Sequence, residues 1–188
     1  MNSFDTDIEN CLRVLHGGGI ILYPTDTIWG IGCDATNAAA VEKIIELKNR
    51  PQQKSFVVLV ASEREVLQYV AAVDLSVFDY VNEATNPTTV IYNDALGFAE
   101  NILANDGSVA IRICKDEFCK HLIKRFRKPI VSTSANISGM PAPAAFCEVD
   151  AQIKSGVDYV VEHRQNEDTP AKPSSIIKWN NGKIEIIR

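Results

Sequence analysis

Short, continuously apolar runs separated by amphipathic stretches constrain the fold of this chain more than any other feature. Two such runs, Ile20 to Tyr23 and Phe56 to Val60, have the length and composition of strands buried on both faces. Between them, residues 37–48 place Val41 and Ile44 on one face of a helix. This alternation of buried strands with amphipathic helices predicts an α/β fold.

The rest of the chain continues the alternation without an internal repeat or a low-complexity linker, which predicts one domain, residues 1–188. Further helices are predicted at 5–16, from Ser62 to about Val70, at 75–81 and at 118–126. Further strands are predicted at 89–92, 108–113, 130–132 and 159–161, with a hairpin of 175–179 and 183–187 turned by Asn180-Asn181-Gly182. Residues 25–36 and 133–139 are predicted to be loops.

Two helix ends are informative. Gly17-Gly18-Gly19 precedes a strand and lacks a Lys-Ser/Thr ending, so it indicates a helix stop rather than a phosphate loop. Arg50-Pro51 ends the second helix, because proline disfavours helical geometry in the residue before it. Lys48 continues the inward face of that helix seven residues after Val41, where a solvated lysine is not expected.

Composition narrows the class of protein. With 46% hydrophobic and 23% charged residues, the chain has the balance of a globular protein with a full core. Its N-terminus lacks a signal-peptide pattern and no apolar stretch approaches about eighteen residues, so we expect a soluble, cytoplasmic protein that does not associate with membranes. The five cysteines form no CxxC pair and accompany no histidine cluster, so we expect reduced, mostly buried thiols rather than disulfides or a zinc site.

Charge is distributed unevenly along the chain, whose net charge is −5. Residues 63–106 hold eight acidic side chains and one basic side chain, a net of −7, whereas residues 112–128 hold seven basic and two acidic side chains, a net of +5. The second segment predicts either a basic surface for an anionic partner or an ordinary solvated helix face, and the sequence leaves both open.

Two polar segments are candidates for chemistry, because the sequence lacks GxSxG and HExxH motifs and has only three histidines, none in a ligand-like arrangement. Residues 48–54 carry Lys48 and Arg50 after a helix, a pair that can neutralise a polyphosphate or can simply be surface charge. Residues 132–139 follow a strand and offer hydroxyl and amide groups suited to phosphate oxygens, or to an ordinary turn. Both could open onto one cleft at the edge of the sheet.

Four motifs in order resemble the YrdC-like threonylcarbamoyl-AMP synthase family in its short, single-domain form. They are Tyr23-Pro-Thr-Asp-Thr27-Ile-Trp-Gly-Ile-Gly32-Cys-Asp, Lys48-x-Arg50-Pro, Val109-Ala-Ile-Arg112, and Ser132-Thr-Ser-Ala-Asn136-x-Ser-Gly. The likeness extends from about Gly18 to Arg188. It implies a twisted open mixed sheet with flanking helices around a concave basic cleft.

The resemblance also implies site residues. The ATP site of the family maps onto Lys48, Arg50, Thr89, Ser134, Asn136 and Ser174, of which Lys48, Arg50, Ser134 and Asn136 would be catalytic. The threonine site maps onto Thr27, Arg112 and Ser132. Physically, Arg112 can hold a carboxylate as a bidentate fork, while Lys48 and Arg50 offset triphosphate charge.

The implied reaction is the nucleotidyl transfer that joins L-threonine, bicarbonate and ATP as threonylcarbamoyl-AMP and releases pyrophosphate, for the t6A modification of tRNA. Mg²⁺ would arrive with ATP, and no protein-held metal or tightly bound cofactor is expected. Implied partners are the downstream threonylcarbamoyl transferase proteins and double-stranded RNA or tRNA. Two alternatives stay open: an RNA-binding protein of this fold without the activity, and a paralogue that makes another carbamoyl adenylate, as in hydrogenase maturation.

This sequence departs from the family pattern at three places. Trp29 stands where the family usually has Tyr or Phe, and we expect it to pack as an aromatic wall. The segment from Thr85 to Thr89 lacks the glycine of the PGPxT motif. Lys172-Pro-Ser174-Ser175 stands where the family tends to carry Arg and PST.

Overall fold

The computed structural model describes residues 4–50, 56–167, 172–180 and 182–188. The helices are α1 (Asp5–His16), α2 (Ala38–Lys48), α3 (Glu63–Tyr69), α4 (Ser76–Glu83), α5 (Glu117–Phe126) and α6 (Ala151–Gly156), with single 3₁₀ turns at Glu100–Ile102 and Phe146–Glu148. The strands are β1 (Ile21–Tyr23), β2 (Gly30–Gly32), β3 (Val57–Val60), β4 (Thr88–Tyr92), β5 (Val109–Ile113), β6 (Ile130–Ser134), β7 (Tyr159–Val160), β8 (Ser175–Asn180) and β9 (Lys183–Ile186).

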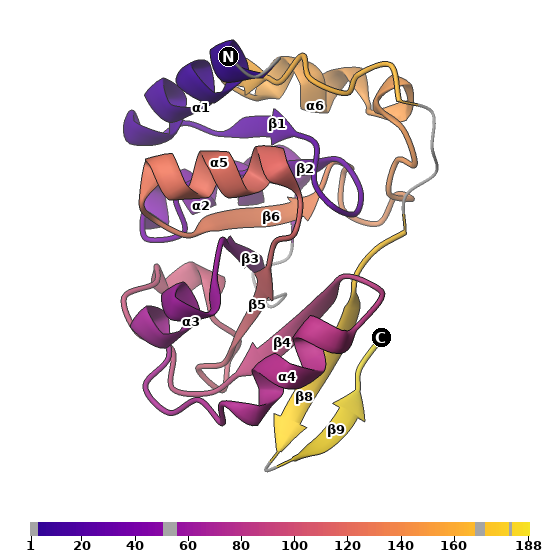
Figure 1. Ribbon diagram of the computed structural model, residues 1–188. Helices are drawn as coiled ribbons and strands as arrows, with labels where there is room; N and C mark the ends of the chain where they lie inside the picture. The colour runs from indigo at the N-terminus through magenta and orange to yellow at the C-terminus, as the bar shows by residue number, and fades with distance from the viewer. Residues whose placement is uncertain (1–3, 51–55, 168–171, 181) are drawn as a thin grey trace.

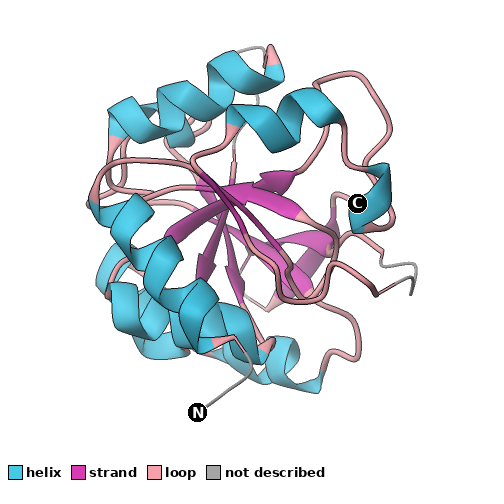
Figure 2. Ribbon diagram, turned by 90° about the horizontal axis from the view of Figure 1, so that it is seen from above, coloured by secondary structure: helices cyan, strands magenta, loops and turns pink. Residues whose placement is uncertain are grey.

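The strands form one mixed sheet in the order β7-β1-β2-β6-β3-β5-β4-β8-β9. Its strands change direction from β1 and β6, which run across the view of Figure 1, to β4 and β8, which run steeply, so the sheet is strongly twisted. The helices lie around the outside of the sheet when the molecule is seen from above (Figure 2). The α/β class is as the residue pattern predicts, and the twisted mixed sheet is as the resemblance implies.

Buried apolar strands and one apolar face per helix form the core. The predicted runs become β1 and β3, whose residues Leu22 and Leu59 are fully buried, and the inward residues Val41 and Ile44 of α2 pack beside them. Burial on both faces explains why these strands read as continuous apolar runs rather than as alternating ones.

Both helix stops of the sequence analysis fall where expected. Helix α1 ends at Gly17, whose N–H donates to the carbonyl of Arg13, and Gly18 follows in the left-handed region at φ 70°. Helix α2 begins after Asn37, whose side chain accepts from two backbone N–H groups, and ends at Asn49 in the left-handed conformation at φ 49°. Asn49 therefore forms the C-cap of α2, while Pro51, to which we attributed the stop, lies outside the described residues.

The prediction of a loop over residues 25–36 is wrong at its centre, where β2 lies between β1 and β6. The Gly-Ile-Gly sequence of β2 has no strand signal of its own, because glycine is depleted in strands. A Cβ atom on Gly32 would lie 2.6 Å from Cε1 of Tyr23 and 2.7 Å from the carbonyl oxygen of Val131. Glycine is therefore required at position 32, because β1 and β6 both approach it closely from either side of β2. Only the packed sheet reveals this constraint.

Strand β6 is longer than the predicted strand 130–132 and includes Thr133 and Ser134 of the predicted loop. The extension exists because β2 pairs with it, Gly30 opposite Ser134 and Ile31 opposite Thr133. The polar end of β6 is thus held as a strand by β2, and its hydroxyl groups have fixed positions.

The C-terminal hairpin forms as predicted, with β8 parallel to β4 and antiparallel to β9. Asn180 pairs with Lys183, and Asn181 of the predicted turn lies outside the described residues. The cysteines are free thiols in the structure, four buried and Cys147 exposed. No helix in the described ranges has the length and apolar character needed to cross a membrane.

Candidate functional site

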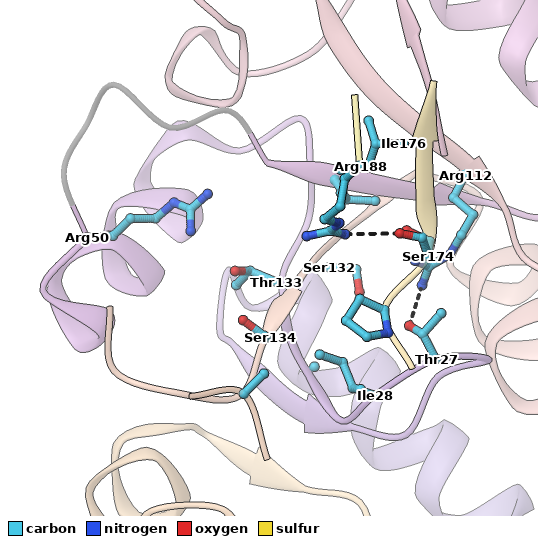
Figure 3. Close-up of a pocket in the computed structure, with 14 residues that line it drawn as sticks. Thr27, Ile28, Arg50, Arg112, Ser132, Thr133, Ser134, Ser174, Ile176 and Arg188 are labelled. Atoms are coloured by element: carbon cyan, nitrogen blue, oxygen red, sulfur yellow. Dashed lines mark hydrogen bonds between the residues drawn. The ribbon is translucent and has the colours of Figure 1, made fainter. Parts of the chain in front are cut away.

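A pocket with a cavity volume of about 240 Å³ is lined by residues of β2, β3, β5, β6 and β8 and of the neighbouring loops (Figure 3). It is lined by Thr27, Ile28, Gly30, Arg50, Val57, Arg112, Ser132, Thr133, Ser134, Ala142, Pro173, Ser174, Ile176 and Arg188. Six of the nine residues predicted for the two substrates lie in this wall: Thr27, Arg50, Arg112, Ser132, Ser134 and Ser174. The structure thus brings together residues that are as far apart in sequence as Thr27 and Ser174.

Arg112 is buried in β5, with 4% of the residue exposed, and its guanidinium borders the pocket. Its Nη2 donates to Oγ1 of Thr27 at 3.2 Å and lies 3.0 Å from Oδ1 of Asp26. The Nε–H of Arg112 has no hydrogen-bond acceptor among the described residues. A buried donor without an acceptor is costly, which marks this guanidinium as a candidate for binding an anion in the pocket.

A hydroxyl network holds Thr27 in place. The Thr25 hydroxyl donates to the carbonyl of Ile28 at 2.8 Å and lies 3.0 Å from the Thr27 hydroxyl. Since a hydroxyl has one proton, Thr27 must be the donor of the second bond. The Thr27 oxygen is therefore an acceptor toward Arg112, and it can accept from a ligand cation as well.

Lys48 and Asn136 shape the loop after β6 and do not line the pocket. Lys48 is 1% exposed, and its ammonium donates to the backbone carbonyls of Ser134 and Asn136. The Asn136 amide donates to the carbonyls of Ile137 at 3.0 Å and Met140 at 2.7 Å. Burial, and secondarily the charge of Arg50, lowers the pKa of Lys48 to about 7.

Arg50 and Ser134, the other members of the two motifs, do face the pocket. The Arg50 guanidinium lies 4.4 Å from the centre of the Phe56 ring, and burial lowers its pKa. Figure 3 places Arg50 and Arg112 on opposite sides of the pocket, with Ser132, Thr133 and Ser134 between them. Each predicted pair thus contains one residue that supports the loop and one that borders the cavity.

Thr89 lies behind the pocket wall. It is fully buried, and its hydroxyl lies 2.8 Å from that of Ser174, which lines the pocket. The parallel pairing of β4 with β8, Thr89 opposite Ile176, brings these two distant segments together. Thr89 therefore acts on the pocket by orienting Ser174.

Arg188 is a pocket residue that the sequence analysis did not single out. Its Nη2 donates to the carbonyl of Ser174 at 3.2 Å (Figure 3), and its backbone pairs with Ile176. Its position depends on the hairpin folding back beside β4, and no local pattern marks it. Trp29, expected to be an aromatic wall, packs on Phe146 with ring centres 4.7 Å apart and is not among the residues that line this pocket.

The electrostatics of the pocket favour an anionic ligand. Three arginines line it, Arg50, Arg112 and Arg188, and no acidic side chain is among the described lining residues. A ligand with two separated negative groups can contact Arg112 at one side and Arg50 at the other, with the β6 hydroxyls between them. In the described part of the chain, no cluster of three or more His, Cys, Asp or Glu side chains is suited to hold a metal ion.

Comparison with known proteins shows the family of this chain. The Sua5/YciO/YrdC family model, described as "Telomere recombination", matches residues 13–188. The chain belongs to this family. Curated family members named threonylcarbamoyl-AMP synthase include that of Pseudoalteromonas translucida, 29% identical over 97% of this chain and 98% of the relative, and that of Vibrio parahaemolyticus, 31% identical over 90% and 92%.

Solved structures show the same fold. Sua5 of P. abyssi in complex with L-threonine superposes with a TM-score of 0.85 at 22% identity, covering 97% of this chain and 54% of Sua5. This chain therefore spans about half the length of that protein. YciO of E. coli superposes with a TM-score of 0.82 at 19% identity, over 97% and 88% of the two chains. A full-length HypF shares the fold at 23% identity and a TM-score of 0.82, with 96% of this chain and 28% of HypF covered.

The basic segment 112–128 is not one uniform surface. The Lys115 ammonium donates to the carbonyls of Val81 and Ala84, and Lys128 pairs with Asp34 at 2.6 Å. Lys124 and Arg127 are exposed and border a separate hollow of about 630 Å³ with Arg64. An RNA-binding face over residues 115–128 remains a prediction.

Proposed function

We propose that the protein is an L-threonylcarbamoyladenylate synthase, which converts L-threonine, bicarbonate and ATP into threonylcarbamoyl-AMP and pyrophosphate. The observation that carries the proposal is the buried Arg112, whose Nε–H lacks an acceptor in the described structure, at the wall of a pocket that Arg50 also borders. Such a pocket suits a carboxylate at one side and phosphates at the other. Membership of a family with synthases among its curated members supports the same chemistry.

In the proposed amino-acid subsite, Arg112 binds the carboxylate of threonine and Thr27 accepts from its amine. Strand β3 lies between β5 and β6, and its residue Leu59 pairs with Arg112 of β5. Ser132 lies on β6, on the other side of β3, and its hydroxyl completes the polar wall of the pocket. The bound L-threonine of the P. abyssi homologue supports a threonine site in this fold. Threonine's amine takes up bicarbonate-derived carbon dioxide as a carbamate before it meets the nucleotide.

In the proposed nucleotide subsite, Arg50, Ser134 and Ser174 contact ATP, and Lys48, Asn136 and Thr89 hold these contacts in position. The carbamate oxygen attacks the α-phosphate, and pyrophosphate leaves. Catalysis then depends on holding the reactants together and on stabilising the phosphoryl charge, without a covalent enzyme intermediate. Mg²⁺ would enter with ATP as part of the substrate, since no carboxylate stands among the described lining residues to hold it.

The test is pyrophosphate release by the purified protein with ATP, Mg²⁺, bicarbonate and L-threonine. We expect release that stops when either threonine or bicarbonate is omitted, and threonylcarbamoyl-AMP as the product identified by mass spectrometry. The product is expected to support t6A formation when the downstream threonylcarbamoyl transferase proteins and tRNA are added. Pyrophosphate release without bicarbonate would indicate ordinary amino-acid adenylation and contradict the proposal.

Two other outcomes separate the alternatives. Adenylate formed only with carbamoyl phosphate would indicate chemistry of the hydrogenase-maturation type. Salt-sensitive binding of double-stranded RNA or tRNA through Arg64, Lys124 and Arg127, with no adenylate under any condition, would leave an RNA-binding protein. Serine is expected to replace threonine at reduced efficiency and not to be excluded, since one methyl group in a pocket discriminates by only ~1–3 kcal/mol.

A further inference from the structure

Arg164 occupies an unusual backbone position near the pocket. It lies between β7 and β8 with φ at 69°, in the left-handed region that a residue with a Cβ atom rarely adopts. Such a conformation persists only where the surrounding structure determines it, and it is enriched at functional sites. The contacts around Arg164 therefore indicate the role of its side chain.

The backbone around Arg164 is held by a buried carboxylate from α1. Asp7 accepts from the N–H groups of Glu162 at 3.0 Å and His163 at 2.9 Å. Glu167 closes the turn, because its N–H donates to the carbonyl of Arg164 at 3.2 Å and its carboxylate accepts from Nε at 2.6 Å. These contacts aim the remaining end of the guanidinium at the loop before β2.

The Nη1 atom of Arg164 joins two segments that carry the proposed amino-acid subsite. It donates to the carbonyl of Thr25 at 3.3 Å and to Oδ2 of Asp116 at 3.1 Å. Asp116 is also the N-cap of α5, because its Oδ1 accepts from the N–H of Cys119 at 2.9 Å. Arg164 thus ties the loop that holds Thr27 to the helix that follows β5, the strand of Arg112.

The distance between that loop and that strand sets the position of the Arg112 guanidinium. Thr27 and Asp26 contact the same nitrogen of Arg112, and both side chains of the Asp26–Arg112 ion pair are at most 10% exposed. A buried guanidinium held at one nitrogen by a hydrogen bond to Thr27 and an ion pair with Asp26 moves with those two groups. A displacement of the loop would therefore turn the Nε–H of Arg112 away from its ligand.

We propose that Arg164 is a positioning residue for the amino-acid subsite, acting on Arg112 through Thr25, Asp116 and the loop of Asp26 and Thr27. The proposal rests on the synthase function, in which Arg112 binds the amino acid's carboxylate. Arg164 itself is not among the residues that line the pocket. Its loss changes the affinity for the amino acid and leaves the nucleotide subsite intact.

The kinetic test uses Arg164→Gln, Arg164→Lys and Asp116→Asn, with Arg125→Gln on the exposed face of α5 as the matched control. Asparagine is as good an N-cap as aspartate, so Asp116→Asn removes the ion pair and keeps the cap. We expect Arg164→Gln and Asp116→Asn to raise KM for threonine about tenfold, KM for ATP to stay within about twofold, and Arg164→Lys to recover part of the loss. In a Thr27→Ala background the effect of Arg164→Gln should fall below about twofold, because both changes act on Arg112.

A spectroscopic measurement makes the inference independent of the proposed reaction. The NMR signal of the Arg112 Nε–H group, assigned by its disappearance in Arg112→Lys, should shift in Arg164→Gln and stay unchanged in Arg125→Gln. An Arg112 signal that does not move in folded Arg164→Gln overturns the inference, whatever the activity. Equal rises in KM for both substrates, or full additivity with Thr27→Ala, would also overturn it. Absence of threonine-dependent turnover in the wild type contradicts the synthase function instead, and the NMR result then decides the positioning role.

Discussion

Replacement of Lys48 by methionine tests whether this lysine supports the loop after β6. Methionine has a similar length and fills the buried site, but it leaves the carbonyls of Ser134 and Asn136 without their donor. An unsatisfied buried carbonyl lowers the free energy of unfolding by about 1–3 kcal/mol. Part of this loss is recovered, because the variant no longer buries an ammonium group in a site that lowers its pKa to about 7. We expect the free energy of unfolding to fall by about 2–3 kcal/mol and Tm by roughly 5–10 °C, at ~2–4 °C per kcal/mol for a chain of this size.

The pH dependence of this loss has a defined sign. The folded-state pKa of Lys48, about 7, is below the ordinary value of 10.5 that applies to the unfolded chain. Between these values the unfolded state binds the extra proton, so the stability of the wild type rises with pH by up to about 1.4 kcal/mol per unit relative to the methionine variant. The deficit of Lys48→Met should be smallest near pH 6 and should grow toward pH 9.

Urea unfolding followed by far-UV circular dichroism between pH 6 and pH 9 measures both quantities. Lys43→Met is the matched control, because Lys43 lies on the same helix and donates to a carbonyl, that of Gly18, from an exposed position. We expect the free energy of unfolding of the control to fall by less than about 0.5 kcal/mol. A Lys48→Met protein as stable as the wild type, with a flat pH dependence and no ATP binding, would refute the supporting role and place the ammonium on the nucleotide.

Two further predictions concern the pocket and the sheet beneath it. Arg112→Lys should raise KM for threonine by about tenfold or more, because a point charge replaces a fork that Thr27 and Asp26 orient; unchanged threonine affinity by calorimetry would remove Arg112 from the subsite. Gly32→Ala should lower the free energy of unfolding by about 1–3 kcal/mol, since its Cβ would lie 2.7 Å from the backbone oxygen of Val131; a loss below about 0.5 kcal/mol in urea unfolding would show that β1 and β6 can separate at little cost.

In the candidate site, residues of the same sequence motif have different structural roles. Lys48, Arg50, Ser134 and Asn136 stand in two compact motifs, and the structure brings all four to one loop region. Only Arg50 and Ser134 border the cavity, whereas Lys48 and Asn136 bond backbone carbonyls. The helical periodicity that placed Lys48 inward was informative, because an inward lysine at a helix end must find acceptors nearby.

The sequence by itself determined the elements whose signal is local. Helices α1, α2 and α5 and strands β1 and β3 follow from apolar patterns and caps, because an amphipathic helix imposes a period on its residues and a doubly buried strand requires a continuous apolar run. Only the tertiary structure decided β2, the polar end of β6 and the position of Arg188, since each depends on a partner distant in sequence: Gly30 opposite Ser134, and Arg188 beside Ile176. The hydrogen bonds of Arg164 to Thr25 and Asp116 were likewise decided by the tertiary structure, because a hydrogen bond across 139 or 48 residues produces no periodic pattern in the sequence.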